Sequence, residues 1–392
     1  MSYYILPKNN NNININPILT DDPLNKPDIS HSLYNYYNES REQIVECIND
    51  QDLSFNTYEE IIKIINPYEY IFSKVPGSKF SVSKLKPKTN LFYDFLEVCT
   101  SLNVFEGFKN KKINSLHITK NHIDSIECYE MLRENFTDNI FFSDNTNDEF
   151  IKSLNDNKFD FLFFETKNEN INSYISSLIE FLTIILRHQN SEGLCIIKIN
   201  HIFYKPFIDI LYLLSSLYEK IYIIKPNTSN VTSFDKYIIC KFFLLDENRI
   251  NYYKLNYIKL ILLLKMAANK NITSVIDNII PYYFTLKIND MNIIIGQQQL
   301  ESLDQIINIL KNKNKEEKIE IVKKINIQKS VNWCEKYKIP YNKFTEKINI
   351  FLPIIKEVKE IQEIQEIQEI QEIQEIQEIQ EIQEIQEIQE MQ

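Results

Sequence analysis

The chain has 392 residues, of which 44% are apolar, and a formal net charge of −11. This length suits one large domain or two ordinary ones, with enough apolar residues for a proper core. The six cysteines form no C-x-x-C pair and predict free thiols in a reducing compartment. No leader pattern opens the chain, and its most apolar stretch, Tyr257–Met266, is too short to span a bilayer. These features exclude a membrane partner, and we expect an intracellular, cytoplasmic protein.

From the N-terminus, Lys8–Asn16 is rich in asparagine and is predicted to be disordered. Helical spacing predicts helices at Glu39–Ile48 and Tyr58–Ile65, which end before Asn66-Pro67. The connector Lys74–Lys88 follows.

The middle of the chain alternates predicted helices and strands. Helices are expected at Asn90–Cys99, Ile123–Glu134 and Ile171–Arg187, and strands at Ile113–Ile118, Ile140–Ser143 and Phe159–Phe164. This alternation predicts an α/β fold with a mostly parallel sheet covered by helices on both faces. After Phe243 the pattern becomes helical, at Tyr257–Ala268, Leu300–Lys311 and Lys313–Lys324.

The segment Gly193–Phe243 packs strand, helix, strand, loop and strand into a short stretch. The run Leu194–Ile199 is apolar except for Lys198, which suits a strand buried on both faces. A charge in such a strand needs a partner or a task. A generic strand-helix-strand unit with a salt-bridged lysine would explain the same pattern.

The strand lysine, the run YIIKPNTSN and the acidic residue before KYIICKFF together resemble FtsJ-like RNA ribose 2′-O-methyltransferases. The resemblance is closest to the cap-modifying branch and its relatives in large DNA viruses, and it covers Lys79 to Phe243. It implies a Rossmann-like methyltransferase sheet, S-adenosylmethionine as cofactor and RNA as substrate. A viral protein of this kind would work in the host cytoplasm or the virion.

The family uses a Lys-Asp-Lys-Glu set, in which a lysine of lowered pKa acts on the ribose 2′-hydroxyl. Lys198 matches the central lysine, Glu165 matches the aspartate and Asp235 matches the glutamate, so the two acidic side-chain lengths are exchanged. The first lysine falls near Leu91. Lys86 or Lys88 would replace it only if the alignment slips. A buried charge cluster without catalysis is the competing interpretation.

The cofactor loop departs further from the family. A glycine-bearing loop after the first strand lets backbone N–H groups reach the cofactor carboxylate. Here the strand INSLHI is followed by Thr119–Asp124, which contains no glycine, and taking Leu96–Thr100 as the first strand does not restore the loop. Asp144 is the candidate for binding the cofactor ribose, although an aspartate at a strand end is also ordinary turn chemistry.

Other sites are weakly indicated. His117, His122 and Cys128 do not match zinc-ligand spacing, and no phosphate-binding glycine motif occurs. Four lysines of the connector lie near Phe80 and could follow an RNA backbone: Lys79, Lys84, Lys86 and Lys88. A solvated connector explains the same residues.

The segment Glu360–Gln392 is a Glu-Ile-Gln repeat of eleven triplets, the last of them Glu-Met-Gln. A period of three drifts against 3.6 residues per helical turn, so the isoleucines form no constant stripe. We predict a solvated, partly helical appendage, with an oligomerisation or docking helix as the alternative. The eleven glutamates equal the net charge of −11, so the rest of the chain is neutral and its charge does not exclude an RNA partner.

Four regions are predicted: an N-terminal region, partly disordered and then helical (1–75), a methyltransferase-fold domain (76–245), a helical region (246–358) and the repeat tail (359–392). The leading hypothesis for function is a catalytically impaired FtsJ-like methyltransferase-fold protein that binds RNA or a protein partner. The alternatives are an active S-adenosylmethionine-dependent RNA 2′-O-methyltransferase and a structural protein of a virus particle.

Overall fold

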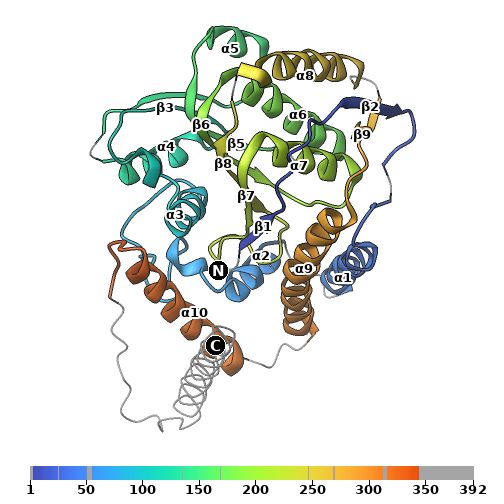
Figure 1. The fold of residues 1–392 in the computed structure, drawn as a ribbon. Helices are drawn as coiled ribbons and strands as arrows, with labels where there is room; N and C mark the ends of the chain where they lie inside the picture. The colour runs from blue at the N-terminus through green and yellow to red at the C-terminus, as the bar shows by residue number, and fades with distance from the viewer. Residues whose placement is uncertain are drawn as a thin grey trace, which may run out of the picture. The chain divides into compact units, whose positions relative to one another are not determined.

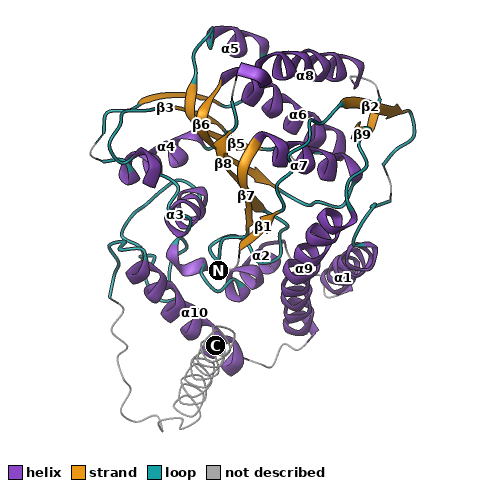
Figure 2. Ribbon diagram, in the orientation of Figure 1, coloured by secondary structure: helices purple, strands orange, loops and turns teal. Residues whose placement is uncertain are grey.

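The computed structural model describes residues 3–343 except 25, 51–54, 135, 168, 246, 268–269 and 312–315. Its centre is a seven-stranded sheet in the order β1-β7-β8-β6-β5-β3-β4 (Figure 2). The strands are Tyr3–Leu6 (β1), Asn114–Ile118 (β3), Asn139–Ser143 (β4), Phe159–Glu165 (β5), Gln189–Ile199 (β6), Tyr218–Ile224 (β7) and Lys236–Phe243 (β8). Strands β4, β3, β5 and β6 are parallel, whereas β8 is antiparallel to β6 and β7, and β1 is antiparallel to β7.

Helices cover both faces of this sheet (Figure 1). They are Leu91–Ser101 (α3), His122–Leu132 (α4), Asp148–Ser153 (α5), Ile171–His188 (α6), Lys205–Leu217 (α7) and Glu247–Met266 (α8). The steps from β3 to β4 and from β5 to β6 run in opposite directions along the sheet, so right-handed crossovers place α4 and α6 on opposite faces. Helix α3 packs on α4, and α8 packs on α6. The expected α/β class, with a mostly parallel sheet covered by helices on both faces, is confirmed.

Strand β5 shows why the sheet needs two helical layers. Phe161 and Phe163 lie on one side and contact Phe95 of α3 edge to face, with ring centroids 6.1 and 4.9 Å away. Phe164 lies on the other side and stacks on Phe181 of α6 at 4.5 Å. Each fully buried phenylalanine stabilises the fold by about 1.5–3 kcal/mol. The apolar run FDFLFFE is therefore a central strand that is buried on both faces.

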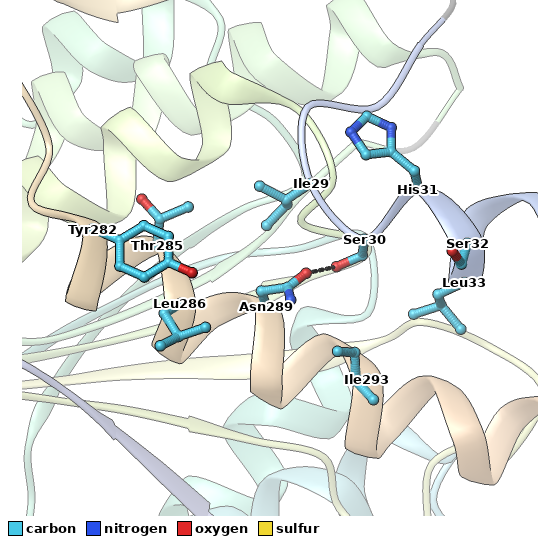
Figure 3. Close-up of a pocket in the computed structure, with 10 residues that line it drawn as sticks. All are labelled: Ile29, Ser30, His31, Ser32, Leu33, Tyr282, Thr285, Leu286, Asn289 and Ile293. Atoms are coloured by element: carbon cyan, nitrogen blue, oxygen red, sulfur yellow. Dashed lines mark hydrogen bonds between the residues drawn. The ribbon is translucent and has the colours of Figure 1, made fainter.

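Elements from both ends of the described chain complete the molecule. They are Ile15–Thr20 (β2), His31–Asp50 (α1), Phe55–Ile65 (α2), Asn271–Ile276 (β9), Tyr282–Lys311 (α9) and Glu316–Lys336 (α10), with short 3₁₀ turns at Glu69–Ile71 and Glu106–Phe108. Strands β2 and β9 form a separate antiparallel pair. Helix α1 packs on α9. A hollow of about 410 Å³ lies between the start of α1 and α9, where the Ser30 hydroxyl donates to Asn289 at 2.8 Å (Figure 3).

The N-terminal segment differs from its expectation. Lys8–Asn16 was predicted to be disordered, but Ile13 is fully buried and its N–H donates to the Tyr252 hydroxyl at 2.7 Å. Ile15 is buried as well and begins β2. Two isoleucines among many asparagines thus anchor this segment in the core. Strands β1, β2 and β9 were not predicted, and the four region boundaries stay a prediction.

Part of the C-terminal expectation lies outside the described residues. The residues of this part that lie outside the description are 344–392, which contain the whole Glu-Ile-Gln repeat, and 312–315, where the helix expected at Lys313–Lys324 would begin. Among the helices that the structure describes, none combines the length and the apolar character needed to cross a membrane.

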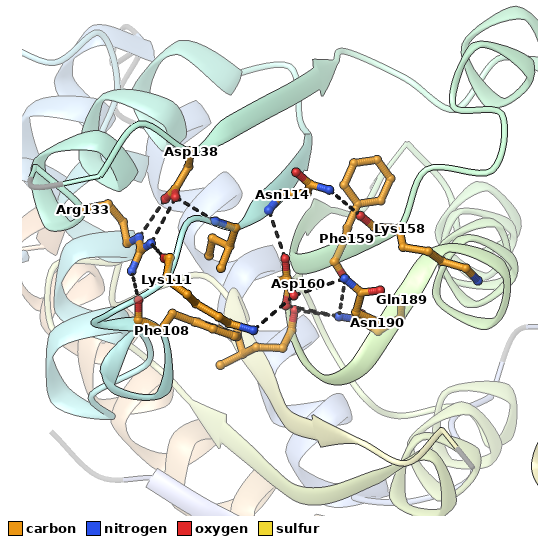
Figure 4. A network of polar contacts seen from close by, with 12 residues as sticks. Phe108, Lys111, Asn114, Arg133, Asp138, Lys158, Phe159, Asp160, Gln189 and Asn190 are labelled. Atoms are coloured by element: carbon orange, nitrogen blue, oxygen red, sulfur yellow. Dashed lines mark hydrogen bonds and ion pairs between the residues drawn. The ribbon is translucent and has the colours of Figure 1, made fainter. Parts of the chain in front are cut away.

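A buried polar network closes the edge of the sheet where β3 and β5 begin (Figure 4). Arg133 and Asp138 are both almost fully buried, and the guanidinium meets the carboxylate through Nε at 2.8 Å and Nη2 at 3.1 Å. The same guanidinium donates to the carbonyls of Phe108 and Lys111, at 2.6 and 2.7 Å. Each nitrogen of the guanidinium and each oxygen of the carboxylate therefore has a hydrogen-bond partner, which offsets the cost of burying the two charges.

Candidate functional site

The candidate site lies at the opposite edge, where the parallel strands end. The chain leaves β3 at Ile118, β4 at Ser143 and β5 at Glu165. Strand order reverses between β3 and β5, because β4 extends the sheet on one side and β6 on the other. Ligands of open α/β sheets bind beyond the carboxyl ends of the strands at such a reversal.

Glu165 and Lys198 meet because β5 and β6 are parallel neighbours with these residues in register. The Lys198 Nζ lies 2.7 Å from the Glu165 Oε1, and each side chain keeps about 20% of its surface exposed. The Thr119 hydroxyl donates to the other Glu165 oxygen. Glu165 therefore holds the strand lysine and the start of the loop after β3 together.

Asp235 joins this pair from the residue before β8. Its Oδ1 accepts a hydrogen bond from the Asn200 Nδ2 at 3.0 Å, and its charge contributes to the pKa of Lys198. The structure therefore brings Lys198, Glu165 and Asp235 together, as their candidate roles require. Whether they are catalytic stays a prediction.

The electrostatics of Lys198 differ from those of a general base. Burial lowers the pKa of this lysine, but the negative charges of Glu165, Asp235 and Asp94 outweigh burial and leave the pKa above its usual value. Lys198 therefore stays protonated at neutral pH. It can stabilise negative charge in this state, but it cannot accept a proton from a ribose hydroxyl.

Helix α3 supplies acids that the sequence analysis missed. Asp94 is buried, accepts the Thr228 hydroxyl at 2.5 Å and the Tyr237 hydroxyl at 3.2 Å, and burial raises its pKa to about 7. Glu97, one helical turn further, is fully buried and accepts the indole N–H of Trp333 at 3.2 Å. Two acids at i and i+3 inside the apolar run LFYDFLEVC were the available signal.

The position expected for the first lysine is occupied by the uncharged Leu91. Leu91 is buried among apolar residues, and the side chains of Lys86 and Lys88 are exposed. Helix α3 instead contributes an acid, Asp94, whose charge acts on Lys198. The first lysine of the expected set therefore has no matching lysine at Leu91.

Lys225 is a half-buried lysine near the cluster that sequence reasoning missed. Its Nζ donates to the carbonyls of Asn230, Ser233 and Asp235, at 3.1, 2.5 and 3.3 Å. Burial lowers its pKa to about 8. The ammonium of Lys225 therefore donates its hydrogen bonds to carbonyls of the loop 226–235. These bonds hold in place the segment that carries Thr228 and Asp235.

A cavity of about 280 Å³ lies beyond the carboxyl ends of β3, β4 and β5. It is lined by Ile118, Lys120, Asn121, Asp144, Asn145, Thr146, Glu165, Thr166, Lys167, Glu169 and Phe181. Asp144 is about 60% exposed, and its Oδ1 lies 2.6 Å from the Nδ1 of His122, which stacks on Phe142. The structure therefore places Asp144 at this cavity, where its role in cofactor binding stays a prediction.

The loop after β3 fits S-adenosylmethionine poorly. The N–H of Thr119 donates to the Ser143 carbonyl at 3.1 Å, and the N–H of Asn121 donates to the Thr119 hydroxyl at 3.1 Å. The N–H of Asp124 donates to the Asn121 carbonyl at 3.1 Å. These amides are engaged within the chain, so they are not free to receive a cofactor carboxylate, and Lys120 brings a long side chain to the same wall.

The histidine and cysteine candidates serve the core. His117 is fully buried among the rings of Phe95, Tyr129 and Phe161, and burial lowers its pKa to about 3. Cys128 is buried as a free thiol. Within the described ranges, no three histidine, cysteine or acidic residues are grouped as metal ligands would be.

The connector lysines lie on a fixed backbone. The N–H of Lys84 donates to the Pro340 carbonyl and that of Lys88 to the Asp124 carboxylate, both at 2.8 Å. All four lysine side chains are exposed, as is Phe80, at 54%. A hollow of about 170 Å³ is lined by Phe80, Ser81, Ser83, Lys84, Lys86 and Asn342.

Comparison with known proteins adds little to this geometry. No family model and no curated protein matches the sequence. Among solved structures, phosphoethanolamine N-methyltransferase 2 of Haemonchus contortus, in complex with S-adenosyl-L-methionine, matches at 14% identity and a TM-score of 0.26, over 42% of each chain. The same enzyme with phosphomonomethylethanolamine and S-adenosylhomocysteine matches at 12% identity and 0.24, over 40% of this chain and 41% of that one. The matches span about two fifths of the enzyme, and a likeness this weak carries no argument about the site.

Proposed function

We propose that this chain is an FtsJ-like RNA ribose 2′-O-methyltransferase-fold protein of the mRNA cap branch that has lost most or all catalytic power. In this proposal it acts as an RNA-binding or partner subunit. The residues Gly193–Phe243 carry the family resemblance, and the Rossmann-like sheet agrees with it.

The loop Thr119–Asp124 is the observation that carries the proposal. Methyl transfer needs backbone N–H groups that face the cofactor, and three amides of this loop are engaged inside the chain. Side chains of Lys120 and Asn121 line the cavity where the family presents a glycine-bearing turn. A methyl donor held without these contacts would lose the orientation that the reaction requires.

The charge balance around Lys198 supports the same proposal. A general base needs a pKa near the working pH. Glu165, Asp235 and Asp94 instead keep Lys198 charged. A lysine held in its charged form does not serve as the general base of methyl transfer.

The surface around Phe80 supports the RNA role. Exposed lysines next to an exposed aromatic ring provide phosphate contacts and a stacking platform, the two elements of sequence-tolerant binding to single strands. Lys84 and Lys86 lie beside the hollow that Phe80 lines.

Two measurements on the full chain test this function. With labelled S-adenosylmethionine and capped RNA, we expect no transfer of label. In fluorescence anisotropy with the same RNA, the double variant Lys84→Glu/Lys86→Glu should bind the RNA at least about tenfold more weakly than the wild type. The slope of log affinity against log salt concentration should fall by about two released counterions. The variant Lys287→Glu/Lys311→Glu changes the net charge equally at exposed positions of α9 and serves as the control.

The alternative is an active S-adenosylmethionine-dependent RNA 2′-O-methyltransferase. The cavity of about 280 Å³ beside Ile118 favours it, because space remains at the position expected for the cofactor. Label that is transferred to the RNA by the wild type, and is not transferred by Lys198→Met, would establish this alternative.

The binding test has its own contrary outcome. Equal RNA affinity of the wild type and the Lys84→Glu/Lys86→Glu variant would show that the surface around Phe80 does not bind RNA.

A further inference from the structure

A strip of side chains that the proposed function does not use lies on one edge of the central sheet. It is formed by β1 and β7, the last two strands at that edge, and by the neighbouring β8. Strand register and the alternation of side chains place five residues on the same face, and we call them the edge strip: Tyr3, Ile5, Lys220, Tyr222 and Lys241. The opposite face of β7 is buried in the core and packs on α7.

The edge strip presents an aromatic ring to the surface. Tyr3 is 52% exposed and Ile5, beside it on β1, is 50% exposed. The ring of Tyr3 meets the half-buried ring of Tyr222 edge to face, with ring centroids 5.7 Å apart and an angle of 70° between the planes. This contact restricts the Tyr3 ring, which still keeps half of its surface open. Nucleic-acid bases stack on such rings without regard to sequence, because every base has a π-face.

The charged members of the edge strip are both lysines. Lys220 is exposed, and Lys241 is half-buried beside it, since the two residues are paired across β7 and β8. The Lys241 Nζ lies 5.7 Å from the centroid of the Tyr222 ring and donates to the Leu102 carbonyl at 2.5 Å. These contacts hold one ammonium close to the aromatic pair, and Lys220 adds a second at the surface.

The acids beside the edge strip have cations of their own. Glu219 lies on the other side of β7, because successive residues of a strand alternate, and it pairs with Lys8. Glu106, whose charge acts on Lys241, has the Lys109 Nζ 3.7 Å from its Oε1. The strip itself contains no acid, so its charge is complementary to a polyanion.

We propose that the edge strip is a contact surface for single-stranded RNA. A base stacks on Tyr3, and the phosphates next to that base face Lys220 and Lys241. An aromatic platform with cations along the backbone is the combination that sequence-tolerant binding of single strands uses. A duplex does not fit this surface, because its bases are stacked inside the helix. The inference rests on the RNA role proposed above, and none of the five residues lines the hollow at Phe80.

Fluorescence anisotropy of the full chain with a labelled oligouridylate of about 15 nucleotides tests this surface. We expect Tyr3→Leu to weaken binding about fivefold or more, because leucine is apolar but offers no ring for stacking. Tyr3→Phe keeps the ring and should bind like the wild type. Tyr36→Leu is the matched control, since it removes a ring of similar exposure, 59%, from α1.

The salt dependence separates the ring from the cations. Lys220→Glu should lower the slope of log affinity against log salt concentration by about one released counterion. Tyr3→Leu should weaken binding at every salt concentration and leave the slope unchanged, because stacking releases no counterions. Lys254→Glu makes the same charge change at an exposed position of α8 and should weaken binding less than Lys220→Glu.

The possible failures are distinguishable. Equal affinity of the wild type and Tyr3→Leu, with weaker binding by Lys84→Glu/Lys86→Glu, would overturn the edge strip and leave the proposed RNA role intact. A loss in Tyr3→Phe or Tyr36→Leu as large as in Tyr3→Leu would also overturn it, because stacking on Tyr3 would then not be the contact. If the wild type binds neither the oligouridylate nor capped RNA, the edge strip and the RNA role both fail.

Discussion

The side chains of the candidate site are arranged by neighbours that are distant in sequence. Lys198 is held by Glu165 of the adjacent strand, and its charge is fixed by two further carboxylates, Asp235 and Asp94. Asp94 in turn shares Thr228 with Glu97. The charges of Asp235 and Asp94 act on Lys225 as well as on Lys198, and one acid of the cluster, Asp94, gains its proton near neutral pH.

The stability of the protein should depend on the protonation of Asp94. Burial raises the pKa of this carboxyl from 3.8 to about 7, so the folded state binds the proton more tightly than the unfolded state. Its contribution to the free energy of unfolding is therefore full below pH 4 and is lost as the pH rises through about 7. Asp94→Asn cannot ionise, and we expect it to be more stable than the wild type at pH 8 by about 1–2 kcal/mol.

Urea unfolding at pH 4 and pH 8 measures this difference, and the gain should vanish at the lower pH. Asp290→Asn, at an exposed position of α9, is the control and should change stability equally at both values. A destabilised Asp94→Asn at pH 8 would show that the ionised carboxylate contributes more through Lys198 than its burial costs.

At the scale of elements, the network at the amino edge of the sheet joins α4 to β4 and to the turn before β3. Arg133→Met would leave Asp138 as a buried charge without its cationic partner and would remove the guanidinium donors to the carbonyls of Phe108 and Lys111. Removing one member of such a pair costs about 3–5 kcal/mol. We expect a loss of this size in the free energy of unfolding.

Adding Asp138→Asn to Arg133→Met should recover part of the loss, because the second change removes the stranded charge. Lys109→Met, at an exposed position nearby, should leave stability within about 0.5 kcal/mol of the wild type. A loss below about 1 kcal/mol in Arg133→Met would mean that water replaces the guanidinium at little cost.

The sequence predicted the elements whose pattern is local and missed those that depend on tertiary contacts. Apolar runs predict the strands around Phe161 and Lys198, and helical spacing predicts the helix between them. Strand β1 has four residues and exists because it pairs with β7, more than 200 residues away. Strand β9 likewise depends on β2. Such short strands carry no strong period of their own.

The same division holds for the site. Lys198 was found because it interrupts an apolar strand, whereas Glu165 and Asp235 were found because they match the acidic positions of the family that the sequence resembles. Asp94 and Lys225 escaped because their significance lies in burial and in distant partners, the hydroxyl of Thr228 and the carbonyls of loop 226–235. Only the fold brings these groups together.

At the scale of the whole molecule, the repeat tail dominates net charge. Removing Glu360–Gln392 removes eleven glutamates and leaves a neutral chain. We expect truncation after Lys359 to leave the melting temperature unchanged and to raise RNA affinity modestly, most visibly at low salt, where exposed charges are screened least. Thermal melting, light scattering and salt-dependent RNA binding on both chains measure this. A change of oligomeric state on truncation would instead support the docking-helix alternative.

The central proposal is that this chain has a methyltransferase-like fold without a working cofactor site. Calorimetric titration of the full-length protein with S-adenosylmethionine tests this claim most directly, with the variant Lys120→Gly/Asn121→Gly as a comparison that shortens both side chains in the wall of the cavity. The account predicts no measurable binding to the wild type at millimolar cofactor. Saturable binding of S-adenosylmethionine at micromolar concentration would contradict it and make the chain an active enzyme candidate.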